Sequence, residues 1–255
     1  MSNIIISGAN SGIGYYMVEQ LLADGNNVAV LDIETDNLNK LHEQYGEKLI
    51  SYICDMRKTE SVEKSVNDIA IKFKTIDIAV QNACLCTFKS LEDTNEGTYK
   101  DVFDVNYFGA LRLSKAVIPY MKKQNSGKII FTSSGVGVMG FINISPYASS
   151  KGAIESLAKC LGIEYKNYGI TFHIFQPPLT LTKSAEPLPV PNEFMANPKV
   201  VGNGLAKHIK SKSFIICHSF SQKLQTKLCY SFPIKMGIMM SKMTERYIET
   251  TKNSN

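Results

Sequence analysis

Short apolar runs alternate with longer amphipathic stretches along most of the chain. The apolar runs cover residues 3–7, 27–32, 49–54, 76–82, 128–133, 170–175 and 213–218. Continuous apolar character, without alternation, is what the strands of a parallel sheet require when helices cover both of its faces. Helical periodicity lies between them, at residues 13–24, 36–45, 59–73, 98–123, 147–167 and 198–210. The alternation predicts an α/β fold, a doubly wound parallel sheet with right-handed crossovers.

A proline-rich break and a second pair of helices follow this pattern. Residues 183–198 contain four prolines and no clear period, which is typical of a long binding loop. Beyond residue 218, Pro233 separates two stretches whose apolar residues fall at helical spacing. These residues are Phe220, Leu224 and Leu228 in the first stretch, and Met236, Met240, Met243 and Tyr247 in the second.

Three interpretations of this C-terminal stretch stay open. The helix pair could pack on its own domain or on a dimer mate. It could form a methionine-lined cover on an apolar substrate pocket, or it could contact a membrane surface. Charge bears on the choice, since residues 183–255 carry a net +7 and residues 1–182 a net −2, within a total of +5.

The remaining bulk features indicate a cytoplasmic protein. The first residues, MSNIIISGAN, are not a signal peptide, and no apolar run approaches the ~18 residues needed to span a bilayer. Six scattered cysteines show no disulfide framework. The basic C-terminal region has no nucleic-acid-binding motif, so nucleic acid is not an expected partner.

A glycine-rich turn, SGANSGIG at residues 7–14, joins the first predicted strand to the first predicted helix. Gly8 permits the tight turn, Gly12 lets the main chain approach a pyrophosphate, and Gly14 allows close helix–sheet packing. Asp32 ends the next strand, 18 residues beyond Gly14, close to the ~20 expected of an acid that binds a ribose. Its carboxylate would repel a 2′-phosphate, so NAD is favoured over NADP.

Four polar residues further along suggest acid–base chemistry. Tyr147 and Lys151 are four residues apart on a predicted helix, so their side chains share one face. An ammonium group beside a phenol lowers the pKa of the phenol and makes it a usable acid or base. Ser134 follows a predicted strand, at the sheet edge where ligands bind. Asn106 lies inside a predicted helix, where asparagine has only a moderate helix propensity. Its side chain could have a functional role, or it could be a buried amide with a purely structural role.

In order and spacing these motifs resemble the short-chain dehydrogenase/reductase family. The matching motifs are SGANSGIG, Asp32, CDM with Asp55, QNAC at 81–84, Asn106, Ser134 and YASSK at 147–151. The resemblance covers residues 1–182, and loosely extends to 218. It implies a Rossmann sheet of seven strands in the order 3-2-1-4-5-6-7. It also implies a catalytic domain over 1–218 with a substrate loop at about 183–212. Most members of the family end soon after the seventh strand, so the helices predicted over 219–255 form an atypical extension.

The resemblance also implies residue roles. Tyr147 would be the general acid/base, Lys151 would lower its pKa and hold the nicotinamide ribose, and Ser134 would bind the substrate oxygen. Asn106 would shape its helix and hold a water that links to Lys151. The implied cofactor-binding residues are Gly8, Asn10, Ser11, Gly12, Ile13, Gly14, Asp32, Asp55, Met56, Asn82, Ala83, Tyr147, Lys151, Pro177, Thr180 and Thr182, and no metal ligand is expected.

Two positions depart from the family pattern. Pro178 replaces the glycine that usually follows Pro177, which removes an N–H and fixes φ. Cys84 replaces the glycine of the usual Asn-Asn-Ala-Gly, where it would add a side chain at a close backbone contact.

The sequence therefore predicts an NAD-dependent oxidoreductase that interconverts a secondary alcohol and a ketone, with a rather apolar substrate. A homodimer or homotetramer is expected, and peripheral membrane contact through the C-terminal helices is one of the interpretations kept open. The competing hypothesis is a non-catalytic dinucleotide-binding protein on the same fold, which the Pro178 and Cys84 departures favour.

Overall fold

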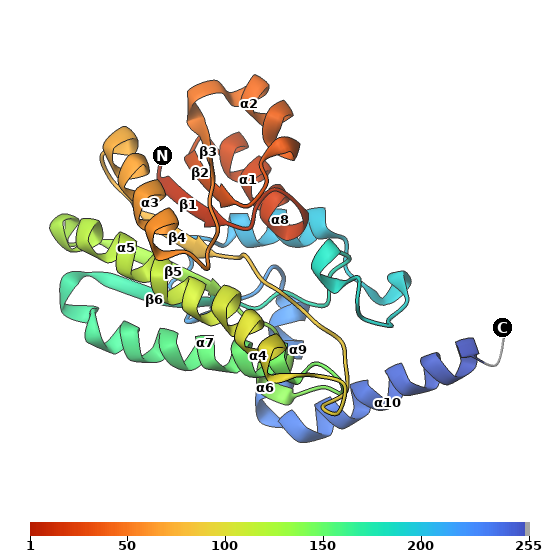
Figure 1. Cartoon of the computed structure of the whole chain (residues 1–255). Helices are drawn as coiled ribbons and strands as arrows, with labels where there is room; N and C mark the ends of the chain where they lie inside the picture. Colours follow the sequence, from red (N-terminus) through yellow and green to blue (C-terminus); the bar gives the residue numbers. More distant parts are fainter. Residues whose placement is uncertain (253–255) are drawn as a thin grey trace.

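Seven parallel strands form one sheet in the order β3-β2-β1-β4-β5-β6-β7, which confirms the predicted topology (Figure 1). The computed structural model describes residues 1–252. The chain reverses its direction of travel across the sheet between the paired strands β1 and β4, and open α/β sheets bind ligands at such a switch point. The strands are β1 (Asn3–Ser7), β2 (Asn27–Asp32), β3 (Leu49–Ile53), β4 (Ile78–Gln81), β5 (Gly127–Thr132), β6 (Ile170–Phe175) and β7 (Ile215–Ile216).

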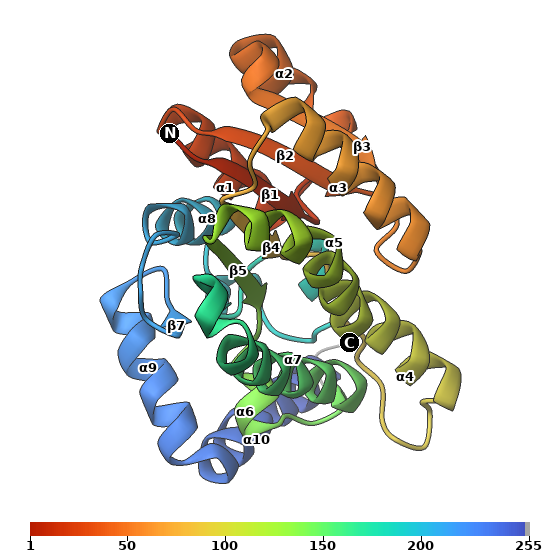
Figure 2. The same cartoon turned by 90° about the vertical axis from the view of Figure 1, so that its left-hand side faces the viewer.

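Helices cover both faces of this sheet. They are α1 (Gly12–Ala23), α2 (Asn39–Tyr45), α3 (Thr59–Phe73), α4 (Glu96–Phe103), α5 (Gly109–Gln124), α6 (Val136–Met139), α7 (Ser145–Glu164), α8 (Pro198–Lys207), α9 (Phe220–Ser231) and α10 (Pro233–Lys252). Figure 2 shows α3, α5 and α7 side by side across one face. Successive strand residues point to opposite faces: Ile5 joins the core under α3, α5 and α7, and Ile4 and Ile6 join the core under α1 and α8. Both faces are thus buried, which explains the continuous apolar runs.

Several element boundaries differ from the sequence prediction, and three predicted elements are interrupted or clearly shortened. The helix predicted over 98–123 is divided into α4, a π-helical segment at Asp104–Phe108, and α5. The strand predicted over 213–218 shrinks to the two residues of β7, because pairing with β6 stops after Phe175–Ile216. The stretch predicted as helical over 36–45 opens with a short 3-10 turn, Asp36–Leu38, before α2.

The C-terminal helices α9 and α10 follow β7 at the edge of the sheet. In Figure 1, α10 runs below the carboxyl ends of the strands, beside α6. A Cβ on Gly237 of α10 would lie 2.5 Å from the Met139 carbonyl oxygen, so only glycine permits this close helix contact. Among residues 1–252, no helix is long and apolar enough to cross a membrane. Residues 253–255 of the predicted extension lie outside the described residues.

Candidate active site

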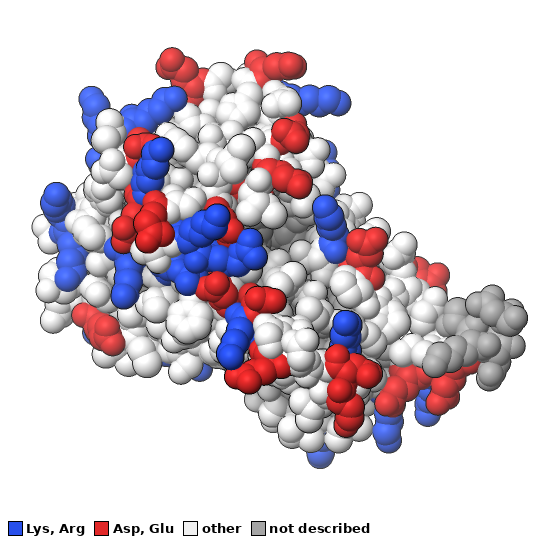
Figure 3. All heavy atoms as spheres, viewed as in Figure 1, with Lys and Arg blue, Asp and Glu red and all other residues white. Residues whose placement is uncertain are grey.

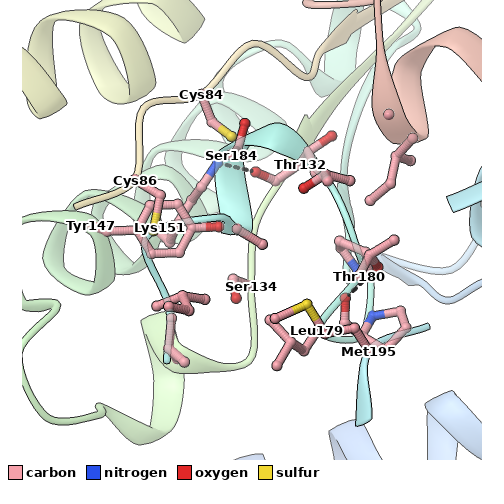
Figure 4. Close-up of a pocket in the computed structure, with 18 of the residues that line it drawn as sticks. Cys84, Cys86, Thr132, Ser134, Tyr147, Lys151, Leu179, Thr180, Ser184 and Met195 are labelled. Carbon is pink, nitrogen blue, oxygen red and sulfur yellow. Dashed lines mark hydrogen bonds between the residues drawn. The ribbon is translucent and has the colours of Figure 1, made fainter. Parts of the chain in front are cut away.

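A cavity of about 1070 Å³ opens at the carboxyl edge of the sheet (Figure 4). Its walls come from the loops after β1, β2, β3, β4, β5 and β6, and from α9 and α10. The predicted residues that line it are Gly8, Ser11, Gly12, Ile13, Asp32, Asp55, Met56, Asn82, Ala83, Ser134, Tyr147, Lys151, Pro177, Thr180 and Thr182. Asn10, Gly14 and Asn106 lie behind these residues and support them. The fold thus brings together nearly all the residues selected from the sequence.

The glycine turn between β1 and α1 fits a dinucleotide. Gly8 and Gly12 have φ of +66° and +58°, values that side-chain-bearing residues rarely adopt. A Cβ on Gly8 would collide with the main chain of Ala83, and one on Gly14 would collide with the Gly8 carbonyl oxygen. The amino end of α1, a helix of 12 residues, therefore faces the cavity across a bare backbone surface suited to phosphate.

Asp32 ties this turn to the end of β2. Its Oδ2 accepts a hydrogen bond of 2.8 Å from the Asn10 main-chain N–H. The Asn10 Oδ1 accepts one of 3.0 Å from the main-chain N–H of Asn37. Asp32 still lines the cavity, so its carboxylate is positioned both to fix the turn and to meet a ribose.

Arg57, which the sequence reasoning missed, holds the Asp55 carboxylate. Its Nη2 donates to Asp55 Oδ2 at 2.8 Å, and its Nε and main-chain N–H also donate to this carboxylate. Hydrogen bonding to Arg57 lowers the pKa of Asp55, against a smaller opposing effect of burial. The guanidinium lies at the cavity wall, and the spacing i, i+2 of opposite charges was a signal that could have revealed the pair.

Tyr147, Lys151 and Ser134 converge on one side of the cavity, as Figure 4 shows. Tyr147 and Lys151 come from the first turns of α7, and Ser134 comes from the loop between β5 and α6. Lys151 is only 2% exposed, and its Nζ donates to the Thr132 carbonyl oxygen at 2.7 Å. The same Nζ lies 5.4 Å from the centroid of the Tyr147 ring. The predicted triad is therefore assembled, with the lysine anchored to the end of β5.

The pKa of Tyr147 departs from the sequence prediction. We expected Lys151 to lower it, but burial raises it well above the usual value for a tyrosine. The neighbouring Cys84 and Cys86 act in the same direction, and Ser134 opposes it. Burial also lowers the pKa of Lys151. The physical reason is that the Lys151 ammonium lies over the phenol ring and bonds to a carbonyl, so desolvation dominates. Tyr147 is thus a protonated donor at neutral pH.

Asn106 is a buried connector between three parts of the site. Its Oδ1 accepts from the Leu85 N–H at 2.8 Å, and its Nδ2 donates to the Leu85 carbonyl oxygen at 3.1 Å. Nδ2 also donates to Ser150 Oγ at 2.9 Å, next to Lys151. Asn106 is 0% exposed and lies in the π-helical segment. The irregular turn, which interrupts the predicted helix, places this amide between the β4 loop and α7.

Cys84 and Cys86, in the loop after β4, both line the cavity. Figure 4 shows the two cysteines on the side where Lys151 and Tyr147 lie. The Cys84 side chain therefore lines the cavity. Burial, followed by the effect of Cys84, raises the pKa of Cys86 to about 12. In the described part of the chain, no group of three or more His, Cys, Asp or Glu side chains could hold a metal ion.

A buried carboxylate behind the triad was also missed from the sequence. Glu155 is one turn beyond Lys151 on α7 and is 4% exposed. Its Oε1 accepts from Ser133 Oγ at 2.7 Å, and its Oε2 accepts from the Tyr230 hydroxyl of α9 at 2.5 Å. Burial and Glu155 both raise the pKa of Tyr230, so this donor keeps its proton. The i, i+4 spacing from Lys151 marks Glu155 as sharing a helix face with it, but nothing in the sequence links it to Tyr230.

Pro178, the second departure from the family pattern, is followed by a segment with regular hydrogen bonding. Thr180 Oγ1 donates to the Pro178 carbonyl oxygen at 2.7 Å. Thr180 also forms a parallel bridge with Ala196, which closes the base of the 183–196 loop. Pro177 and Thr182 line the cavity beside them.

Comparisons with known proteins agree with this geometry. The family profile described as short chain dehydrogenase matches residues 2–191. Retinol dehydrogenase 8 of Homo sapiens is 32% identical over 187 residues, which cover 71% of this chain and 59% of that protein. The chain thus spans about three fifths of the length of that relative.

Solved structures show the same fold. A short-chain dehydrogenase from Streptomyces avermitilis superimposes with a TM-score of 0.80 at 21% identity, covering 100% of this chain and 98% of the other. NAD⁺-bound xylitol dehydrogenase is 30% identical with a TM-score of 0.67, covering 70% of each chain. With its sheet order, glycine turn and assembled Tyr147, Lys151 and Ser134, the chain belongs to the short-chain dehydrogenase family of oxidoreductases, whose members use a nicotinamide dinucleotide.

Proposed function

We propose that this protein reduces a ketone to a secondary alcohol, or carries out the reverse reaction, with NAD as the preferred cofactor and a rather apolar substrate. The observation that carries the proposal is the meeting of Tyr147, Lys151 and Ser134 in the cavity that the glycine turn also lines. Nucleotide and substrate would therefore share one space. The cofactor, when bound, supplies the hydride.

The residues of the chain would handle the proton and the substrate oxygen. In reduction, the protonated Tyr147 hydroxyl donates its proton to the oxygen of the substrate carbonyl. The Ser134 hydroxyl, which lines the same cavity as Tyr147, donates to the same oxygen and aligns it. Lys151, fixed by Thr132, presents its ammonium beside Tyr147 and stabilises the phenolate left after proton transfer.

Preference for NAD rests on Asp32 and Arg57. Asp32 lines the cavity at the end of β2, where its carboxylate suits ribose hydroxyls and repels a 2′-phosphate. Asp55 and Met56 are the residues expected on the adenine side, and Arg57 is the cation nearest to them along the chain. Arg57 is already paired with Asp55. Its charge is therefore largely balanced.

Turnover of a panel of ketones with NADH and with NADPH tests the proposal. Tyr147→Phe should lower kcat by about 10²-fold or more, since it removes the proton donor, while the NADH dissociation constant stays within about twofold. Tyr168→Phe, an exposed tyrosine after α7, is the matched control and should behave like the parent protein.

A non-catalytic dinucleotide-binding protein is the second candidate, and the observations that favour it are Cys84 and Pro178 at positions where the family has glycine. Tight NADH binding without turnover of any ketone, in the parent and in Tyr147→Phe alike, would support that candidate against the proposed activity.

A further inference from the structure

Two helical stripes of the C-terminal extension face the cavity. On α9 the lining residues include Gln222, Gln225 and Thr226, and on α10 they include Met240, Met243 and Tyr247. Each stripe follows the i, i+3, i+4, i+7 spacing of one helix face. Cys229 completes the lining on α9, and Thr244 and Arg246 also line the cavity on α10. The side chains of α9 are mostly polar, whereas Met240, Met243 and Tyr247 give α10 the larger apolar surface, so the two walls differ in chemistry.

The α10 stripe is held against the rim of the active site. The Gly237 Cα approaches the Met139 carbonyl oxygen at the end of α6, so closely that a side chain could not fit. Ser241, 7% exposed, accepts a hydrogen bond of 3.2 Å from the Ile142 main-chain N–H. These contacts fix α10 beside the loop that follows Ser134, on the substrate side of the cavity.

The α9 stripe is fixed by a separate contact. Tyr230 donates to Glu155, one turn from Lys151, with a 2.5 Å hydrogen bond. Thr226 and Cys217 lie 3.6 Å apart, oxygen to sulfur, and tie α9 to the end of β7. The polar wall is therefore anchored to the helix that carries the catalytic tyrosine and lysine.

Another part of the cavity lining is mainly apolar. Leu188, Phe194 and Met195, from the proline-rich loop, line the cavity together with Met240. Apolar surface removed from water contributes roughly 25 cal/mol per Å², so such walls favour a hydrocarbon chain. Methionine adapts its shape to varied apolar ligands. On α9, the Gln222 Nε2 donates to Thr226 Oγ1 at 3.4 Å, and the exposed Gln225 amide can pair with water or with a polar substituent.

We propose that α9 and α10 form the substrate-selective end of the cavity and that the substrate is amphipathic. It is a ketone or secondary alcohol with one long apolar chain along α10 and a hydrogen-bonding substituent facing α9. This inference rests on the proposed function, since the reacting carbon must lie beside Tyr147. The C-terminal helices α9 and α10 then take part in binding the substrate.

Affinity for unbranched 2-alkanones of six to twelve carbons (roughly the reach of such a cavity) tests the apolar wall. Binding is measured calorimetrically with NAD⁺ present, which cannot reduce a ketone. Each added methylene should tighten binding, by up to about fourfold when fully buried. Met240→Ala should weaken the long members about fivefold and leave the short ones unchanged. Met239→Ala, a neighbouring exposed position, is the matched control.

The polar wall is tested with ketones of equal chain length that carry a hydroxyl on one of the three carbons nearest the carbonyl. The best-placed hydroxyl should tighten binding by about 2- to 12-fold. Gln225→Met, which keeps the length of the side chain, should abolish this gain. Lys227→Met, an exposed position of α9 outside the cavity lining, should retain it.

The outcomes separate this inference from the proposed function. Chain-length-dependent binding with no turnover of any ketone would contradict the proposed activity and leave the inference standing. Turnover with affinities that do not change with chain length, or with Met240→Ala equal to Met239→Ala, would overturn the apolar wall. If the added hydroxyl does not increase the affinity, or if it still increases the affinity in Gln225→Met, the proposed polar wall is overturned.

Discussion

Replacing Asn106 with alanine tests how the irregular helix supports the active site. The side chain is 0% exposed and makes three hydrogen bonds, two with the main chain of Leu85 and one with Ser150. Each buried partner left without a hydrogen bond costs about 1–3 kcal/mol. Allowing for partial entry of water, Asn106→Ala should lower the free energy of unfolding by about 3–5 kcal/mol. That is a large share of the ~5–15 kcal/mol typical of a domain.

The assay is urea unfolding followed by circular dichroism, with thermal unfolding alongside. In a chain of this size 1 kcal/mol corresponds to about 2–4 °C, so Tm should fall by roughly 6–20 °C. Asn67→Ala is the control, because Asn67 is an exposed asparagine that accepts a single hydrogen bond, from Tyr120. It should change stability by less than about 1 kcal/mol. Equal stabilities of the two variants would refute the connecting role assigned to Asn106.

Three further predictions follow from the site. Tyr230→Phe should destabilise the protein by about 1.5–3 kcal/mol in urea unfolding, because Glu155 loses a buried donor; stability equal to that of Tyr168→Phe would contradict this. Asp32→Ser should raise the ratio of kcat/KM with NADPH to that with NADH by about tenfold or more, and an unchanged ratio would remove Asp32 from cofactor selection. Burial raises the pKa of Tyr147, so the proton donor persists as pH rises. Accordingly, kcat/KM for ketone reduction should stay level from about pH 7 to about pH 10, the ordinary range of a protonated tyrosine, whereas a fall centred near pH 7 would show a lowered pKa.

The fold and the shared helix face of Tyr147 and Lys151 were accessible from the sequence because local patterns determine them. Ile4, Ile5 and Ile6 point alternately to two buried faces, so their unbroken run predicts a central parallel strand. Tyr147 and Lys151 share a helix face by spacing alone. These features depend on neighbours along the chain, and the structure reproduces them.

Features that depend on distant contacts were not accessible. Tyr230 and Glu155 are 75 residues apart, and their hydrogen bond exists only because α9 folds back on α7. The pKa of Tyr147 depends on how deeply the phenol is buried, which spacing does not reveal. Helical periodicity showed that Met240 lies on an apolar stripe, but not that this stripe faces the cavity.

The distribution of charge on the C-terminal helices was likewise accessible only from the structure. The sequence places a net positive charge in the C-terminal region, but Figure 3 shows both signs along α10 on the face it displays. Lys242, Glu245, Arg246 and Glu249 follow one another along this helix. Mixed charge there gives no single-sign patch on that face, so the net charge of the segment is a poor guide to its partners.

The most direct test of the central claim follows a single hydride. A ketone that binds in the presence of NAD⁺ is incubated with NADH carrying deuterium at the transferable position of nicotinamide C4, and the alcohol product is examined by mass spectrometry. The proposed roles of Tyr147, Ser134 and Lys151 predict one deuterium on the carbinol carbon with the parent protein and at least about 10²-fold less product with Tyr147→Phe. An alcohol without deuterium, or equal deuterium transfer by the two proteins, would contradict the account.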